Sequence, residues 1–213
     1  QARAHHLAAP GEQTSASEGT VSGTLLQRRP VLRPAEVLEF VPGVIVSQHS
    51  GDGKANQYYL RGFNLDHGTD FATWVDGMPV NMPTHAHGQG YTDLNFMIPE
   101  LVQAIHHRKG TFSAEDGDFA SAGSARLQLK DRLEQGQASV TLGENRFARA
   151  LVAGSTELPA GPLLYAVEGA YHDGPWQQPQ HHKRVNALLR HGVQDGATRH
   201  SFTAMLYSAR WDS

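Results

Sequence analysis

The sequence contains no cysteine, which excludes disulfide cross-links and thiolate metal sites. It also lacks an apolar run of the roughly 18 residues that a transmembrane helix needs. The 18 lysines and arginines are scattered and the formal net charge is −3, so the concentrated basic face of a nucleic-acid-binding protein is missing. A membrane protein built from strands remains possible, because such strands alternate apolar and polar residues and keep mean hydropathy low.

Short elements of both kinds fill the first part of the chain. Residues 1–20 are mostly small or polar and predict a flexible leader. Arg33–Gly43 predicts a short helix that Pro42-Gly43 ends, and the β-branched Val44–Ser47 predicts a strand. Further strands are predicted at 57–61, 71–75 and 104–108, with a short helix at 98–102. Residues 21–131 therefore predict one α+β domain.

Two glycine-containing motifs stand inside this domain. Leu60-Arg61-Gly62-Phe63 ends an apolar strand, and Val75-Asp76-Gly77-Met78-Pro79 follows about a dozen residues later. Asp-Gly is a strong signal for a tight turn, so Thr73–Val80 predicts a hairpin.

The pattern changes after about residue 132, where apolar and polar residues alternate with period two. One such segment sets Val185, Ala187 and Leu189 against Arg184, Asn186 and Arg190. About five strands of this kind, joined by polar turns, predict an antiparallel meander over 132–213. By periodicity alone, the start of a membrane barrel and a soluble β-sandwich fit equally well.

Histidine is abundant, with 13 residues, and Thr84-His85-Ala86-His87-Gly88 holds the sharpest cluster. In extended backbone His85 and His87 point the same way and could share one metal ion. His67 with Asp66, or His49 with Asp52, could complete the ligand set after folding. The alternative is that these are polar loop residues held by hydrogen bonds. The candidate ligand-binding residues are His49, Asp52, Asp66, His67, His85, His87 and Tyr91.

The order of the motifs resembles the plug domain of TonB-dependent outer-membrane receptors over roughly residues 20–131. A Pro-Gly-Val strand start at 42–45 is followed by Leu-Arg-Gly, Val-Asp-Gly-Met-Pro and a Pro-Glu-Leu-Val helix at 99–102. A Lys-Gly pair and a glycine-bearing loop then lead into the alternating strands. The resemblance implies an α+β plug domain followed by the first antiparallel strands of an incomplete transmembrane β-barrel, in a family whose whole barrel has roughly 22 strands.

The resemblance also implies roles for individual residues. Arg61 would be a buried structural charge paired with carboxylates, because an unpaired buried charge is costly. Gly62 and Gly77 would be conformational glycines beside Arg61 and Asp76. TonB would engage the N-terminal region, for which Glu18–Ser22 is a poor candidate contact segment and a site upstream of Gln1 is the alternative.

The function implied is active uptake across the outer membrane of a Gram-negative bacterium, with TonB, outer-membrane lipid and the ligand as partners. The ligand expected from the family is an iron–siderophore or other metal complex. No catalytic residue and no cofactor are expected beyond a bound metal or chelate as cargo. The alternative from another class is a soluble α+β module with a β-sandwich, such as an adhesin. A metal-dependent amidohydrolase is suggested only by His-x-His, because too few residues follow for a barrel of about 250 residues.

Overall fold

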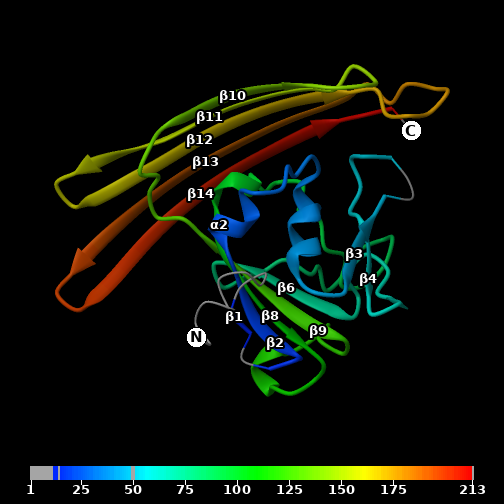
Figure 1. Ribbon diagram of the computed structural model, residues 1–213, viewed down its shortest axis with the longest axis horizontal. Coiled ribbons are helices and arrows are strands. Elements are labelled where there is room, and N and C mark those ends of the chain that lie inside the picture. The colour runs from blue at the N-terminus through cyan, green and yellow to red at the C-terminus, as the bar shows by residue number, and fades with distance from the viewer. Residues whose placement is uncertain (1–11, 14, 49–50, 213) are drawn as a thin grey trace. The chain divides into compact units, whose positions relative to one another are not determined.

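The structure is a computed structural model that describes residues 12–13, 15–48 and 51–212. The chain divides into two compact units (Figure 1). One unit holds residues 1–49 and 54–129, and the other holds residues 50–53 and 130–213. The predicted domain limits at residues 20/21 and 131/132 stay predictions.

A mixed sheet forms the base of the first unit. Its strands stand in the order β1 (Glu12–Gln13), β2 (Glu18–Ser22), β8 (Val102–Lys109), β9 (Gly123–Leu129), β6 (Phe71–Val75) and β7 (Met78–Pro79). The pair β6 and β9 is parallel, and the other neighbours are antiparallel. Strand β2 includes residues 18–20, so the end of the predicted flexible leader lies in this sheet.

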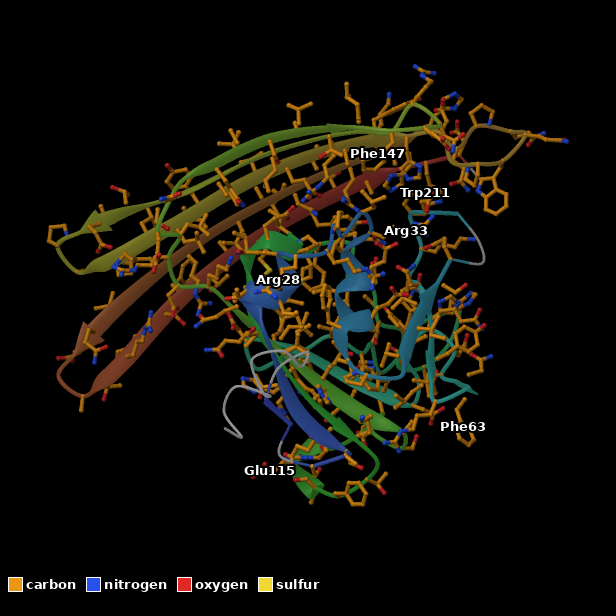
Figure 2. All side chains as sticks on the ribbon, viewed as in Figure 1. Arg28, Arg33, Phe63, Glu115, Phe147 and Trp211 are labelled. Carbon is orange, nitrogen blue, oxygen red and sulfur yellow. The ribbon has the colours of Figure 1, made fainter. Side chains whose placement is uncertain are left out.

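Among the described residues, a smaller sheet and four short helices complete the first unit. The sheet contains β3 (Val44–Ser47), β4 (Gln57–Leu60) and β5 (Phe63–Asn64). The helices are α2 (Gly23–Leu26) and the 3-10 helices η1 (Pro34–Phe40), η2 (Pro99–Leu101) and η3 (Ala114–Asp116). The elements bury a common apolar core that includes Leu38, Tyr58, Phe71, Leu101 and Ile105. Phe63, in contrast, points outward and is 74% exposed (Figure 2).

Both glycine motifs form two-residue hairpin turns. Arg61 and Gly62 have φ of 52° and 85° between the paired residues Leu60 and Phe63. Asp76 and Gly77 have φ of 47° and 82° in the same place between β6 and β7. Two successive positive φ values are the type I′ pattern, whose twist matches that of the flanking strands. The hairpin predicted at Thr73–Val80 is therefore confirmed.

The burial expected for Arg61 is not seen in this structure. Its side chain is exposed, and its guanidinium donates a hydrogen bond to the carbonyl oxygen of Ala16 (3.5 Å). The turn explains this, because the central residues of a two-residue hairpin project from the end of the ladder into solvent. Asp76 is the member of the two motifs that ties its turn to a neighbouring strand, since its carboxylate accepts from the backbone N–H of Leu129 (2.9 Å).

The second unit is one antiparallel sheet that meanders through five strands in sequence order (Figure 1). These are β10 (Gln137–Leu142), β11 (Ala148–Leu158), β12 (Gly161–His172), β13 (His182–Asp195) and β14 (Thr198–Arg210). The predicted five-strand meander is confirmed. The sheet does not close on itself within the described residues, and its antiparallel order rules out the (β/α)₈ amidohydrolase fold.

The two faces of this sheet differ in an unusual way. On β13 the polar Arg184, Asn186 and Arg190 are buried, while the apolar Val185 and Leu189 are 48% and 46% exposed. A soluble β-sandwich buries the apolar face and exposes the polar one, so this pattern is the reverse of that alternative. No helix in the described residues is long and apolar enough to cross a membrane.

A buried ion network crosses the polar face of three of these strands. Glu168 on β12 is fully buried and accepts from the guanidinium groups of Arg149 on β11 and Arg184 on β13. Arg149 Nε lies 2.7 Å from Glu168 Oε2, and Arg184 Nη2 lies 2.8 Å from Glu168 Oε1. Asn186 also donates to Glu168 Oε1 (3.3 Å). One carboxylate thus binds three strands together with charge-assisted hydrogen bonds.

Candidate functional site

The loop after β5 places two adjacent polar side chains on one side of the first unit. Leu65 is buried and its N–H donates to Tyr58, which continues the ladder past β5. Asp66 then has φ of 50°, in the left-handed region. Successive side chains alternate only in an extended strand, so this bend allows Asp66 and His67 to face the same site.

His67 has a fixed orientation. It is 3% exposed, and its Nδ1 lies 3.0 Å from the carbonyl oxygens of Ala55 and Asn56. A carbonyl oxygen can only accept, so Nδ1 carries the proton and Nε2 is the basic nitrogen of the neutral ring. Nε2 faces Asp66, whose Oδ1 is 3.7 Å away.

A second loop, residues 81–91, carries the two clustered histidines. Its base is closed by a bridge between Met82 and Tyr91, with Met82 N–H donating to the carbonyl of Tyr91 (3.0 Å). His85 stacks on the Tyr91 ring at 3.9 Å between centroids. Burial raises the pKa of Tyr91, which keeps the hydroxyl protonated while it accepts a hydrogen bond from Ala55 N–H (2.7 Å).

Asn81 holds these loops together from inside. Its Oδ1 accepts from the N–H of Thr73 (2.7 Å), and its amide donates to the carbonyls of Gly68 (2.9 Å), Phe71 (3.1 Å) and Gly90 (3.1 Å). One buried side chain therefore links strand β6, the loop after His67 and the end of the histidine loop. Nothing in the local sequence marks Asn81, because its partners are set only by the tertiary fold.

The two loops bring Asp66, His67 and His87 together. One ligand atom from each residue lies within 4.8 Å of the others, and this is the group of metal-ligating side chains found among the described residues. The rings of His67 and His87 meet edge to face at 4.5 Å between centroids. His67 is buried at the base, and Asp66 and His87 are exposed. We call Asp66, His67 and His87 the His–Asp cluster.

The remaining candidates are not members of this cluster. His85 is outside the His–Asp cluster, because the segment is irregular rather than extended and His85 Nδ1 accepts from His87 N–H (3.1 Å). The metal pair of His85 and His87 stays a prediction. Asp52 belongs to the second unit, where it is buried and lies 3.2 Å from Nε2 of His172. His49 is outside the described residues.

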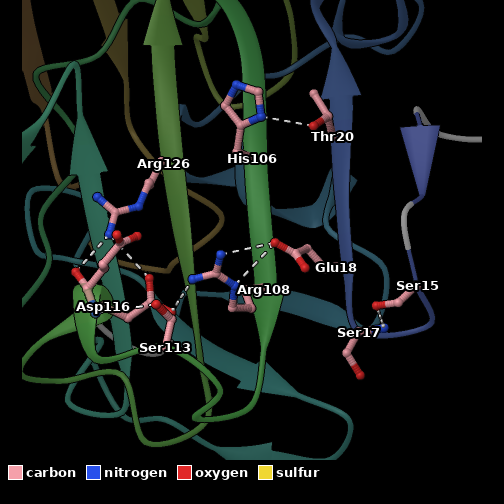
Figure 3. Close-up of polar contacts among 10 residues, drawn as sticks. Ser15, Ser17, Glu18, Thr20, His106, Arg108, Ser113, Asp116 and Arg126 are labelled. Atoms are coloured by element: carbon pink, nitrogen blue, oxygen red, sulfur yellow. Dashed lines mark hydrogen bonds and ion pairs between the residues drawn. The ribbon is translucent and has the colours of Figure 1, made fainter.

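A separate polar cluster occupies the sheet of the first unit (Figure 3). Asp116 is 2% exposed and pairs with Arg108 (3.0 Å) and Arg126 (3.2 Å). Burial would raise the pKa of Asp116, but hydrogen bonds from Arg108, Ser124 and Arg126 lower it below its usual value. These residues line a cavity of about 120 Å³. The acid is fully neutralised by its arginines, which indicates a structural role.

Comparison with known families decides the assignment. Residues 10–124, more than half of the chain, match the family described as the TonB-dependent receptor plug domain. The chain belongs to this family. Receptors of the family lie in the outer membrane of Gram-negative bacteria, bind ligands and interact with TonB, and they are not enzymes.

Solved structures give the same fold for the plug and the strands that follow it. The copper transporter OprC superposes with a TM-score of 0.69 at 21% identity, over 95% of this chain and 33% of the transporter. The ferric enterobactin receptor PfeA of Pseudomonas aeruginosa gives 0.65 at 16% identity, over 91% and 33%. The ferric-catecholate import receptor Fiu of E. coli K12 gives 0.66 at 18% identity, over 94% and 30%.

This chain thus spans about a third of the length of the receptors it matches. Its first unit is a plug domain and its second unit is an open sheet of antiparallel strands that corresponds to the start of the barrel. The predicted family and fold class are confirmed. The names of the structural matches differ in cargo, with copper in one and ferric siderophores in others.

Proposed function

We propose that this chain is the plug and first barrel strands of an outer-membrane receptor that imports a metal, as an ion or a chelate, with energy from TonB. Membership of the plug family supports the transport role. The observation that points to metal is the His–Asp cluster, which sets two imidazoles and a carboxylate within 4.8 Å on two plug loops.

The sheet of the second unit supports an outer-membrane location. Apolar side chains that include Val140, Val152, Val167 and Leu206 are more than half exposed on it, and hydrocarbon is the solvent that suits such a face. Its polar face carries the Glu168 ion network. A soluble adhesin with a β-sandwich would need the opposite arrangement.

Metal accumulation in cells tests the proposal. Cells that express the full receptor are compared with and without TonB, each supplied with a free metal ion or with a ferric siderophore. We expect accumulation of at least one of these forms only when TonB is present. Equal accumulation with and without TonB for every form would reject the proposal.

A further inference from the structure

We propose that the His–Asp cluster binds a bare divalent transition-metal ion by direct coordination, with Nε2 of His67, an imidazole nitrogen of His87 and a carboxylate oxygen of Asp66 as ligands. The cargo would then be the ion itself, of the class of Zn²⁺, Co²⁺, Ni²⁺ or Cu²⁺. This inference rests on the proposed function, because it names the substrate class of the same site.

Hydrogen bonds hold the His67 ring in an orientation suited to metal coordination before any ion binds. Its Nδ1–H is shared by the carbonyls of Ala55 and Asn56, which fixes both the tautomer and the plane of the ring. Metal-binding histidines commonly donate their second N–H to a carbonyl in this way, because the bond orients the ring and raises its basicity. The other ring nitrogen, Nε2, faces Asp66 and is the ligand atom that His67 offers to the cluster.

The spacing between His67 and Asp66 also suits a shared cation. Their facing atoms, Nε2 and Oδ1, are 3.7 Å apart, which is too long for a direct hydrogen bond. Two ligands at about 2.1 Å from a tetrahedral ion stand about 3.4 Å from each other. A cation between these two electron-pair donors would therefore need only a small adjustment of the exposed Asp66 side chain.

His87 can complete the set without a large movement. Its ring already contacts that of His67, and its loop is held by the stack of His85 on Tyr91. Asp66 is 55% exposed in its side chain, so an ion can reach the cluster from solvent.

The chemistry of these loops favours an ion over a siderophore complex. Segments 64–70 and 81–91 contain Asp66 and Asp70 but no lysine or arginine. A ferric catecholate is negatively charged and its iron has no open coordination position, so it would need basic or aromatic contacts rather than imidazole ligands. Two nitrogens and one oxygen, without cysteine, suit borderline divalent ions better than hard Fe³⁺ or soft Cu⁺.

Titration of the purified full receptor in detergent with ZnCl₂ tests the inference by calorimetry. We expect one tight Zn²⁺ site whose affinity falls by at least about tenfold in each of Asp66→Asn and His87→Gln. Both residues are exposed, so these variants should fold. His106→Gln is the matched control, because His106 is an exposed histidine of the same domain that bonds Thr20, and its affinity should be unchanged.

The outcomes separate the inference from the proposed function. Equal Zn²⁺ affinity in Asp66→Asn, His87→Gln and the parent receptor would overturn the inference, as would the absence of a Zn²⁺ site in the parent. If cells then accumulated a ferric siderophore through TonB, the proposed function would stand and only the bare-ion assignment would fail. If no metal form requires TonB for its accumulation, the proposed function itself is rejected.

Discussion

Asn81 and Thr73 lie eight residues apart, and Asn81 Oδ1 accepts the backbone N–H of Thr73 at 2.7 Å. The Asn81 amide also donates to three backbone carbonyls, so this one side chain connects both loops that carry the His–Asp cluster. The arrangement of the cluster is thus supported by a residue that is not one of its three members.

Replacing Asn81 by alanine should loosen both loops together. The change leaves the buried N–H of Thr73 without its acceptor and removes one of the donors to each of three carbonyls, which we expect to cost about 1–3 kcal/mol of local stability. Hydrogen exchange should show faster exchange of backbone amides at Gly68, Thr73 and Gly90. Gln89→Ala, an exposed change in the same loop, is the control, and equal exchange in the two variants would contradict the role of Asn81.

Removing the carboxylate of Glu168 should weaken the sheet of the second unit. Glu168→Ala leaves Arg149 and Arg184 as buried cations without their acid, at an expected cost of about 3–5 kcal/mol. Urea unfolding of the full receptor measures this loss.

An exposed ion pair on the same sheet provides the comparison. Glu157 lies 3.5 Å from Arg132 and both side chains are more than 60% exposed, so Glu157→Gln should cost less than about 1 kcal/mol. If Glu168→Ala and Glu157→Gln lower the free energy of unfolding by similar amounts, the buried network does not stabilise the sheet more than an exposed ion pair does.

Gly77 should resist substitution because of its backbone alone. A Cβ there would meet no atom within 4 Å, yet φ is +82°, so Gly77→Ala should cost about 1–2 kcal/mol in backbone strain. Amide exchange in the hairpin Thr73–Val80 should accelerate. Gly169→Ala serves as the comparison, since Gly169 also has open space but no positive φ, and we expect the stability of its strand to be unchanged or slightly higher. If Gly77→Ala leaves the stability and amide exchange of the hairpin unchanged, the type I′ turn is contradicted.

His107 should make the plug sheet sensitive to acid. Burial, aided by nearby Lys109, lowers the pKa of His107 from 6.5 to about 4. The unfolded chain therefore binds a proton more readily than the folded one, so stability is full above about pH 6.5 and falls as the pH drops toward 4. The loss is up to about 3 kcal/mol.

The measurement is amide exchange of β8 and β9 at pH 7 and pH 5, corrected for intrinsic rates. His107→Gln should flatten the difference, whereas His106→Gln should leave it in place because His106 is exposed. A pH dependence that survives His107→Gln would assign the effect to another group.

Much of the fold follows from local signals in the sequence. Asp76-Gly77 predicts its turn because few residue pairs tolerate two positive φ values, and the alternation around Val185 predicts both faces of β13. Membership of the plug family likewise follows from the order of short motifs, each of which has a local backbone requirement.

The candidate site could be predicted only in part, because its geometry depends on long-range contacts. His67 and His87 are separated by twenty positions and meet only because Asn81 gathers their loops. The left-handed backbone of Asp66 turns two neighbours to one side, which no period-two pattern indicates. The exposure of Arg61, in contrast, has a local cause, since the turn that holds it projects its side chain outward.

We propose that the receptor imports a bare metal ion, bound by the His–Asp cluster, with energy from TonB. The most direct measurement is accumulation of radioactive zinc by cells that express the full receptor, the His87→Gln variant or the His106→Gln variant, each with and without TonB. We predict accumulation that needs TonB, that falls sharply in His87→Gln and that persists in His106→Gln. If TonB-dependent zinc accumulation is equal in the parent receptor and both variants, the His–Asp cluster does not bind the imported ion.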